Sequence, residues 1–166
     1  MNVHNSADPV AVPTSRRRVV IVGGVAGGAS CAARLRRLDE SVDIVVFDRG
    51  PFVSFANCGL PYYVGNVIAD ERRLLVASPE LFRERFNIEV HTHSDVIGVD
   101  LGQRSIRVRD VKNDDVRTEH YDVLVLAPGA APIRPALSGI DLPGVFAVRD
   151  IPDSRRIRAW ITDRHA

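Results

Sequence analysis

Apolar residues along the chain gather in three short continuous runs, over residues 18–22, 43–47 and 122–126. Such runs, rich in β-branched residues, are typical of strands buried on both faces of a parallel sheet. A glycine-rich turn and a helical run over residues 31–38 separate the first two runs. A strand, a turn, a helix and a second strand within about thirty residues form one βαβ unit. The pattern therefore predicts an α/β fold around a parallel sheet.

Weaker patterns predict two further helices and a small antiparallel insertion. A proline suits the first turn of one helix, and a polar turn between two strand-like segments indicates a hairpin. The predicted segments are helices over 79–86 and 151–161, strands over 88–92 and 96–100, and a hairpin of 105–111 with 116–119. Together with the parallel sheet, these segments predict a domain of three layers.

The turn between the first strand and the first helix matches most of a dinucleotide-binding fingerprint. Gly23 and Gly28 occupy the first and last positions of G-x-G-x-x-G, although Val25 replaces the middle glycine. Glycines there permit a tight turn and close approach of a pyrophosphate, which the helix N-terminus then binds. The alternative is a glycine-rich surface loop, which the flanking strand and helix disfavour. We therefore predict a Rossmann-like domain.

Asp48 stands at the end of the second predicted strand, twenty residues after Gly28. A carboxylate at this place can bind the hydroxyl groups of a ribose. The alternative is an ordinary aspartate at a strand end. The glycine turn and Asp48 indicate a dinucleotide, but they do not separate FAD from NAD.

Cys58 is a candidate redox thiol, because it lies in a polar loop bounded by glycine. No second cysteine follows within a few residues, so a redox role would need an outside thiol or oxygen as partner. Ser54 and Asn57 would supply neutral hydrogen-bond donors, and a helix starting at Cys58 would favour the thiolate. A buried structural cysteine is the open alternative.

The first predicted helix has two faces with different chemistry. One face is an apolar stripe at i, i+4 and i+7, which we expect to pack in the core. The neighbouring face carries a hydroxyl and two guanidinium groups at the same spacing, which suits either a phosphorylated ligand or a solvated basic surface. Arg36 adds to the local positive charge. The apolar stripe is Cys31, Leu35 and Leu38, and the polar face is Ser30, Arg34 and Arg37.

Composition adds limits rather than a function. The hydrophobic fraction of 45% and the charged fraction of 26% are ordinary for a globular domain, and a net charge of +1 gives no general attraction to nucleic acid or membranes. No apolar stretch approaches the roughly 20 residues of a membrane helix. Two cysteines are too few for a disulfide scaffold, so we expect a reducing, cytoplasmic compartment and no metal site. We expect a disordered tail over residues 1–17.

Three strings in this order resemble the coenzyme A-disulfide reductase branch of the pyridine nucleotide-disulfide oxidoreductases. The first covers the glycine turn, the second surrounds Cys58, and the third resembles the second flavin motif of that family. The strings are VIVGGVAGGAS at 20–30, SFANCGLPYY at 54–63 and YDVLVLAPGA at 121–130.

The resemblance implies a flavin site, a nucleophile and a substrate site. FAD would contact the glycine turn, the ribose-binding carboxylate, the adenine wall and the flavin motif. Cys58 would form a mixed disulfide with coenzyme A. The implied FAD contacts are Gly23, Gly24, Val25, Ala26, Gly27, Gly28, Asp48, Asp95, Val96, Ala127, Pro128 and Gly129. The implied coenzyme A contacts are Ser30, Arg34, Arg37, Ser54 and Asn57.

Two departures from the family bear on the reaction. Related NADH oxidases and peroxidases that use a sulfenic acid carry a histidine at the position of Ala26, so its absence favours thiol–disulfide chemistry. A basic residue often found at the position of Phe86 is absent, although Arg83 and Arg85 are close.

Family members continue into an NAD(P)H-binding domain and a domain that forms a homodimer. We expect residues 18–166 to be the FAD-binding domain of such an enzyme, as a natural fragment, a split subunit or a shortened chain, without a complete NAD(P)H-driven cycle. Coenzyme A disulfide or a related small thiol or persulfide would be the substrate. An NADH oxidase or polysulfide reductase of the same family is one alternative. A stand-alone FAD-binding module without turnover is the other.

Overall fold

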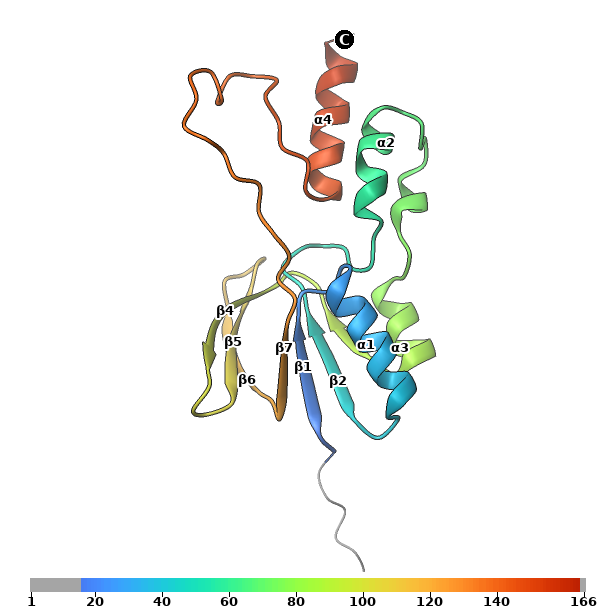
Figure 1. Ribbon diagram of the computed structural model, residues 1–166, viewed down its shortest axis with the longest axis vertical. Helices are drawn as coiled ribbons and strands as arrows, with labels where there is room; N and C mark the ends of the chain where they lie inside the picture. The colour runs from blue at the N-terminus through green and yellow to red at the C-terminus, as the bar shows by residue number, and fades with distance from the viewer. Residues whose placement is uncertain (1–15, 165–166) are drawn as a thin grey trace, which may run out of the picture.

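The computed structural model describes residues 16–164, and its elements form three layers with a fourth group of helices above them (Figure 1). The tail expected over residues 1–17 lies mostly outside the described residues. Arg16 and Arg17 are exposed and have no regular secondary structure.

The middle layer is a parallel sheet of four strands in the order β3-β2-β1-β7. Its strands are β1 (Arg18–Val22), β2 (Asp43–Phe47), β3 (Glu89–His91) and β7 (Val123–Leu126). The central strands β1 and β2 are covered on both faces, which is why their sequences are continuously apolar rather than alternating. The three apolar runs of the sequence are thus confirmed as adjacent parallel strands.

Helices α1 (Gly27–Leu38) and α3 (Pro79–Phe86) cover one face of this sheet. Inside α1, Ala29 and Ala32 are buried against Ile44 and Val46 of the sheet, because their small side chains let helix and sheet approach closely. The helix α3 begins where the Ser78 hydroxyl accepts a hydrogen bond from the Leu81 N–H.

An antiparallel sheet of three strands, in the order β4-β5-β6, covers the other face. Its strands are β4 (Ser94–Asp100), β5 (Ser105–Asp110) and β6 (Val116–His120). Ile106 and Val108 of β5 alternate inward and pack on Val20, Val45 and Phe47 of the parallel sheet. The predicted three-layer α/β class and the hairpin are confirmed.

Above the carboxyl ends of the parallel strands lie four helical elements, of which α2 and α4 run side by side (Figure 1). They enclose a separate apolar cluster of Phe55, Leu60, Leu74 and Ile151. The elements are η1 (Asn57–Gly59), α2 (Leu60–Val64), η2 (Glu71–Leu74) and α4 (Ile151–Asp163).

An ion pair joins η2 to α4. The Arg155 guanidinium donates to both carboxylate oxygens of Glu71, at 2.6 Å from Nε to Oε2, and lies over the Phe52 ring. The hydrogen bond from Arg155 lowers the pKa of Glu71 below its usual value. The ionised pair thus fastens α4 to the segment that follows Cys58.

Three expectations about α1 are wrong. Leu38 is 66% exposed, because it is the last helical residue and the turn it occupies extends past the core. Arg36 adds no charge to the surface, because its side chain is buried and donates to four backbone carbonyls, those of Glu40, Val42, Phe86 and Asn87, each at 2.8 Å. The helix also begins at Gly27, four residues before the predicted start.

Candidate cofactor and thiol site

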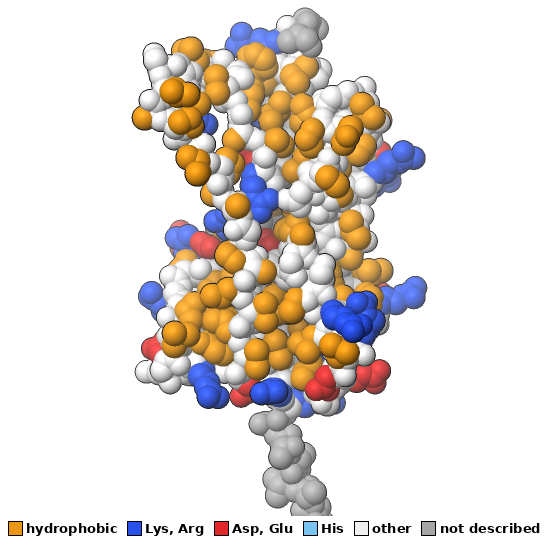
Figure 2. Space-filling view, viewed as in Figure 1, with side chains coloured by type: hydrophobic (Ala, Val, Ile, Leu, Met, Phe, Trp, Pro, Cys, Tyr) orange, Lys and Arg blue, Asp and Glu red, His pale blue; other side chains and the backbone are white. Residues whose placement is uncertain are grey.

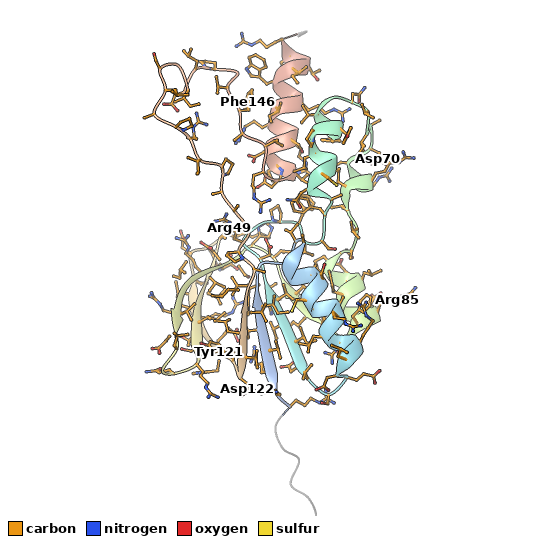
Figure 3. The ribbon with its side chains drawn as sticks, in the orientation of Figure 1. Arg49, Asp70, Arg85, Tyr121, Asp122 and Phe146 are labelled. Carbon is orange, nitrogen blue, oxygen red and sulfur yellow. The ribbon has the colours of Figure 1, made fainter. Side chains whose placement is uncertain are left out.

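Two adjoining cavities, of about 230 and about 410 Å³, lie where β1, β2 and β7 end. In an open parallel sheet this edge is the usual place for a ligand. Figure 2 shows that the molecule narrows between the sheets and the upper helices, and that Lys or Arg side chains lie at this narrow part. Figure 3 places Arg49, which lines the smaller cavity, at this level. The residues that line both cavities are Gly23, Val25, Asp48, Phe55, Pro128 and Arg149.

The glycine turn is packed so tightly that two of its glycines have no room for a side chain. Gly23 has φ +93°, and a Cβ there would collide with the Ala127 carbonyl. A Cβ on Gly28 would collide with the Gly23 carbonyl. The turn therefore holds the first strand, the first helix and the end of β7 against one another, as close approach to a dinucleotide requires.

The N-terminus of α1 opens toward the larger cavity. Ala26 and Gly27 line that cavity, and the first turn of this twelve-residue helix contains no acidic residue. Because neither alanine nor glycine has a polar side chain, the first N–H groups lack a side-chain cap and are available to a phosphate. This arrangement fits the pyrophosphate of a dinucleotide.

Asp48 is buried and lines both cavities. Its carboxylate accepts hydrogen bonds from the backbone N–H of Gly24 (2.7 Å) and of Gly50 (2.8 Å). These bonds fix the glycine turn and the loop after β2 relative to each other. Ribose binding by Asp48 stays a prediction.

Most of the other predicted cofactor residues also line the cavities, whereas Gly24 and Gly28 line neither. Asp95 and Val96 line the smaller one, where the Asp95 carboxylate accepts a hydrogen bond from Arg109 at 3.0 Å. Ala127 and Gly129 line the larger one, next to the glycine turn. The structure thus brings together, around one trough, residues that are more than a hundred positions apart in the sequence.

Cys58 is exposed in η1 and, with Asn57, lines the larger cavity. The thiol therefore opens into the same space as the glycine turn and the segment Ala127–Gly129. Cys31 is partly buried and packs against the hydrophobic core between α1 and the parallel sheet, as predicted. These positions leave Cys58 as the accessible thiol of the two.

Four of the five predicted coenzyme A contacts lie outside the linings of both cavities. Ser30, Arg34 and Arg37 are exposed on α1. Ser54 is half-buried with φ 46°, and its backbone N–H and carbonyl bind Gly24 and Val76, which anchor the cysteine segment to the glycine turn. A ligand that reached both Cys58 and the α1 arginines would extend out of the trough onto the surface of α1.

Arg149 is a site residue that the sequence analysis missed. It lines both cavities, and its Nε donates to the Ala130 carbonyl at 2.6 Å. With the Asn57 amide oxygen turned toward it, Nη1 donates to Oδ1 at 2.7 Å. Its only signal in the sequence is a charged residue, next to Asp150, just before the helix that starts at Ile151.

The residues present therefore fit a flavin dinucleotide, with a tight glycine cradle, a free helix N-terminus and an elongated trough. Among residues 16–164, no cluster of three or more histidines, cysteines or acidic residues suits a metal ion. Within the same range, no helix is long and apolar enough to cross a membrane.

Fold and site together define a Rossmann-type dinucleotide-binding domain with an accessible cysteine beside the cofactor trough. Residues 17–166 match the family described as pyridine nucleotide-disulphide oxidoreductase, and the chain belongs to this family. The resemblance stated from the sequence is thereby confirmed.

Among the curated relatives are coenzyme A disulfide reductases of staphylococci. That of Staphylococcus epidermidis is 40% identical over 149 residues, which are 90% of this chain and 33% of the relative. That of Staphylococcus aureus is 38% identical over 144 residues, which are 87% of this chain and 32% of the relative. The chain thus spans about one third of the length of these relatives.

Several solved structures are also similar to this chain. The reduced CoADR-RHD of Bacillus anthracis is similar with a TM-score of 0.84 and 43% identity, over 92% of this chain and 28% of that one. A NAD-dependent persulfide reductase from A. fulgidus is similar with a TM-score of 0.82 and 31% identity, over 88% of this chain and 27% of that one. A water-forming NADH oxidase from Lactobacillus brevis is similar with a TM-score of 0.79 and 28% identity, over 90% of this chain and 32% of that one.

Proposed function

We propose that this chain is the FAD-binding part of an enzyme that reduces coenzyme A disulfide, or a related small thiol or persulfide substrate, with NAD(P)H. The observation that carries the proposal is the exposed thiol of Cys58, which opens into the same cavity as the glycine turn and Ala127–Gly129. A nucleophile beside a flavin trough, with no second cysteine on its segment, suits a mixed disulfide with an outside thiol.

The first chemical step is a thiol–disulfide exchange. The Cys58 thiolate attacks one sulfur of the substrate, the bond from its Sγ to that sulfur forms, and the substrate S–S bond breaks. The departing thiolate takes up a proton from water. The glycine turn and Ala127–Gly129 would hold FAD, which would supply the two electrons that come from NAD(P)H. Two-electron reduction of the mixed disulfide would restore the Cys58 thiolate and release the second thiol.

The substrate side of the proposal rests on charge. Coenzyme A carries phosphates, and Arg34 and Arg37 are exposed on the helix whose N-terminus lies at the cavity. A persulfide is the nearest alternative substrate, supported by the likeness to the persulfide reductase. The likeness to the NADH oxidase supports oxygen as an acceptor, but Ala26 in the glycine turn favours thiol chemistry.

In the longer protein we propose an NAD(P)H-binding domain and a dimerisation domain in addition to residues 18–166. The segment between Gly129 and α4 supports this, because it exposes large apolar side chains that an isolated domain would not be expected to leave in water. The most exposed are Ile133 (92%), Leu137 (63%) and Leu142 (63%). We expect the homodimer to act in the cytoplasm.

The purified chain should bind FAD in preference to NAD. The physical reason is that the trough continues from the glycine turn past Pro128 to Cys58, which gives room for a flavin beside the thiol. Heat release of the bound nucleotide followed by chromatography measures it, with reconstitution by added FAD if the protein is isolated without a cofactor. Recovery of NAD, or failure to reconstitute with FAD, would contradict the cofactor assignment.

Incubation with coenzyme A disulfide should place one coenzyme A adduct on Cys58. Peptide mapping by mass spectrometry should find it in wild type and in Cys31→Ser, and should find none in Cys58→Ser. An adduct on Cys31 would overturn the choice of nucleophile.

The same reaction tests the phosphate contacts. Replacing Arg34 and Arg37 with alanine should slow labelling by coenzyme A disulfide roughly tenfold, the effect of about 1.4 kcal/mol of lost binding. Labelling by a small uncharged disulfide is the control and should be unchanged. Equal slowing with both reagents would remove these arginines from the substrate site while leaving Cys58 as the nucleophile.

A further inference from the structure

Arg149 connects three segments that meet beside Cys58. Its Nε donates to the Ala130 carbonyl. With the Asn57 amide oriented so that its oxygen faces the guanidinium, Nη1 donates to Oδ1 of Asn57, the residue immediately before the thiol. Its backbone N–H donates to the Asp153 carboxylate in the first turn of α4, at 2.9 Å. The residue therefore ties the cysteine segment to the end of the flavin motif and to α4.

The flavin motif leaves space for this side chain. Gly129 has φ +74°, and a Cβ at this position would collide with Nη2 of Arg149. The glycine therefore serves two needs, since it permits the left-handed backbone and keeps the guanidinium within reach of Asn57. The amide of Asn57 is itself held on its other side, where its Nδ2 donates to the Phe55 carbonyl at 3.2 Å.

We propose that Arg149 is a positioning residue for Cys58, acting through Asn57, and this rests on the proposed function of Cys58 as nucleophile. A planar guanidinium makes both bonds at once in a fixed geometry, which a lysine ammonium does not reproduce. Backbone hydrogen bonds hold both ends of η1, from the Ala56 N–H to the Leu74 carbonyl and from the Gly59 N–H to the Ala56 carbonyl. The Arg149–Asn57 bond adds a side-chain restraint next to the exposed thiol.

The experiment measures the rate at which iodoacetamide, an uncharged reagent, labels Cys58 in the flavin-free chain, with peptides resolved by mass spectrometry. Arg149→Met and Asn57→Leu should each change the rate about fivefold or more, and the double variant should change it no further than either one, as expected for a single shared interaction. Arg149→Lys should behave like Arg149→Met. The matched control is Arg134→Met, since Arg134 lies on the same connecting segment but pairs with Asp141.

A spectroscopic measurement separates positioning from general loss of structure. The side-chain amide resonances of Asn57 should shift in Arg149→Met and stay in place in Arg134→Met, while urea unfolding reports the stability of each variant. Full additivity of the two substitutions, or restoration of the rate by Arg149→Lys, would overturn the proposal. If Cys58 of the folded wild type reacted no differently from the unfolded chain, the proposed function would fail and this inference with it.

Discussion

Gly28→Ala should destabilise the flavin-free domain by roughly 3 kcal/mol or more, the upper range for forcing an extra carbon into a packed site. A Cβ on Gly28 would overlap the Gly23 carbonyl, a backbone atom in the middle of the glycine turn. Relief would require the first strand and α1 to separate, and α1 covers the main core. Thermal or urea unfolding measures the change, which corresponds to a drop of about 6 to 12 °C in Tm for a domain of this size.

Gly27→Ala is the matched control, one residue earlier in the same helix. Its Cβ would meet only the Ala127 methyl group, at 3.6 Å, which is ordinary contact. Alanine is the better helix former by roughly 0.5–1 kcal/mol, so this variant should be as stable as wild type or slightly more. Equal stability of the two variants would contradict the tight packing described for Gly28.

The strands of the parallel sheet were predictable because burial on both faces requires consecutive apolar residues. The runs over 18–22, 43–47 and 122–126 each begin with one charged residue and continue with four apolar ones, and all three lie side by side in the parallel sheet. The antiparallel insertion was predictable for a different reason, since a polar turn must separate its last two strands. Neither pattern reveals the order of strands in a sheet, which depends on contacts between distant segments.

The cofactor trough was predictable only through motifs. The turn at Gly23 and Gly28 and the spacing to Asp48 follow a local rule, and a polar loop bounded by glycine made Cys58 a candidate redox thiol. FAD and coenzyme A came only from the resemblance. No local sequence pattern indicates Arg149, because the role proposed for it depends on hydrogen bonds to Asn57 and Ala130, and both residues are distant from it in the sequence. Single charged residues with distant partners are therefore what the sequence analysis misses.

Arg36 illustrates the same limit within a helix. At i+2 from Arg34 and next to Arg37, it reads as one of several surface arginines. In the structure its guanidinium turns under the end of α1 and satisfies carbonyls from the turn after the helix and from the end of α3. Spacing assigns a residue to a helix face, but it does not say whether a long side chain folds back into the protein.

Arg36→Met should therefore destabilise the domain by about 1–3 kcal/mol, the typical cost of leaving a buried hydrogen-bonding group unpaired. The methionine keeps much of the apolar stem but leaves the buried carbonyl of Val42 and the part-buried carbonyls of Glu40, Phe86 and Asn87 without this donor. Arg37→Met, one residue later on α1, is the control. Arg37 is exposed, so its loss should change stability by less than roughly 0.5 kcal/mol.

Urea unfolding of Arg36→Met, Arg36→Lys and Arg37→Met tests the assignment. Lysine has one ammonium in place of the forked guanidinium, so it cannot reach carbonyls from both α1 and α3 together, and Arg36→Lys should recover only part of the loss. Hydrogen exchange should locate the weakening at residues 39–43 and 86–88, where the carbonyls lie. If Arg36→Met were as stable as Arg37→Met, the buried network would have no net role in holding α1 to α3, and packing of Phe82 and Phe86 would have to carry that contact alone.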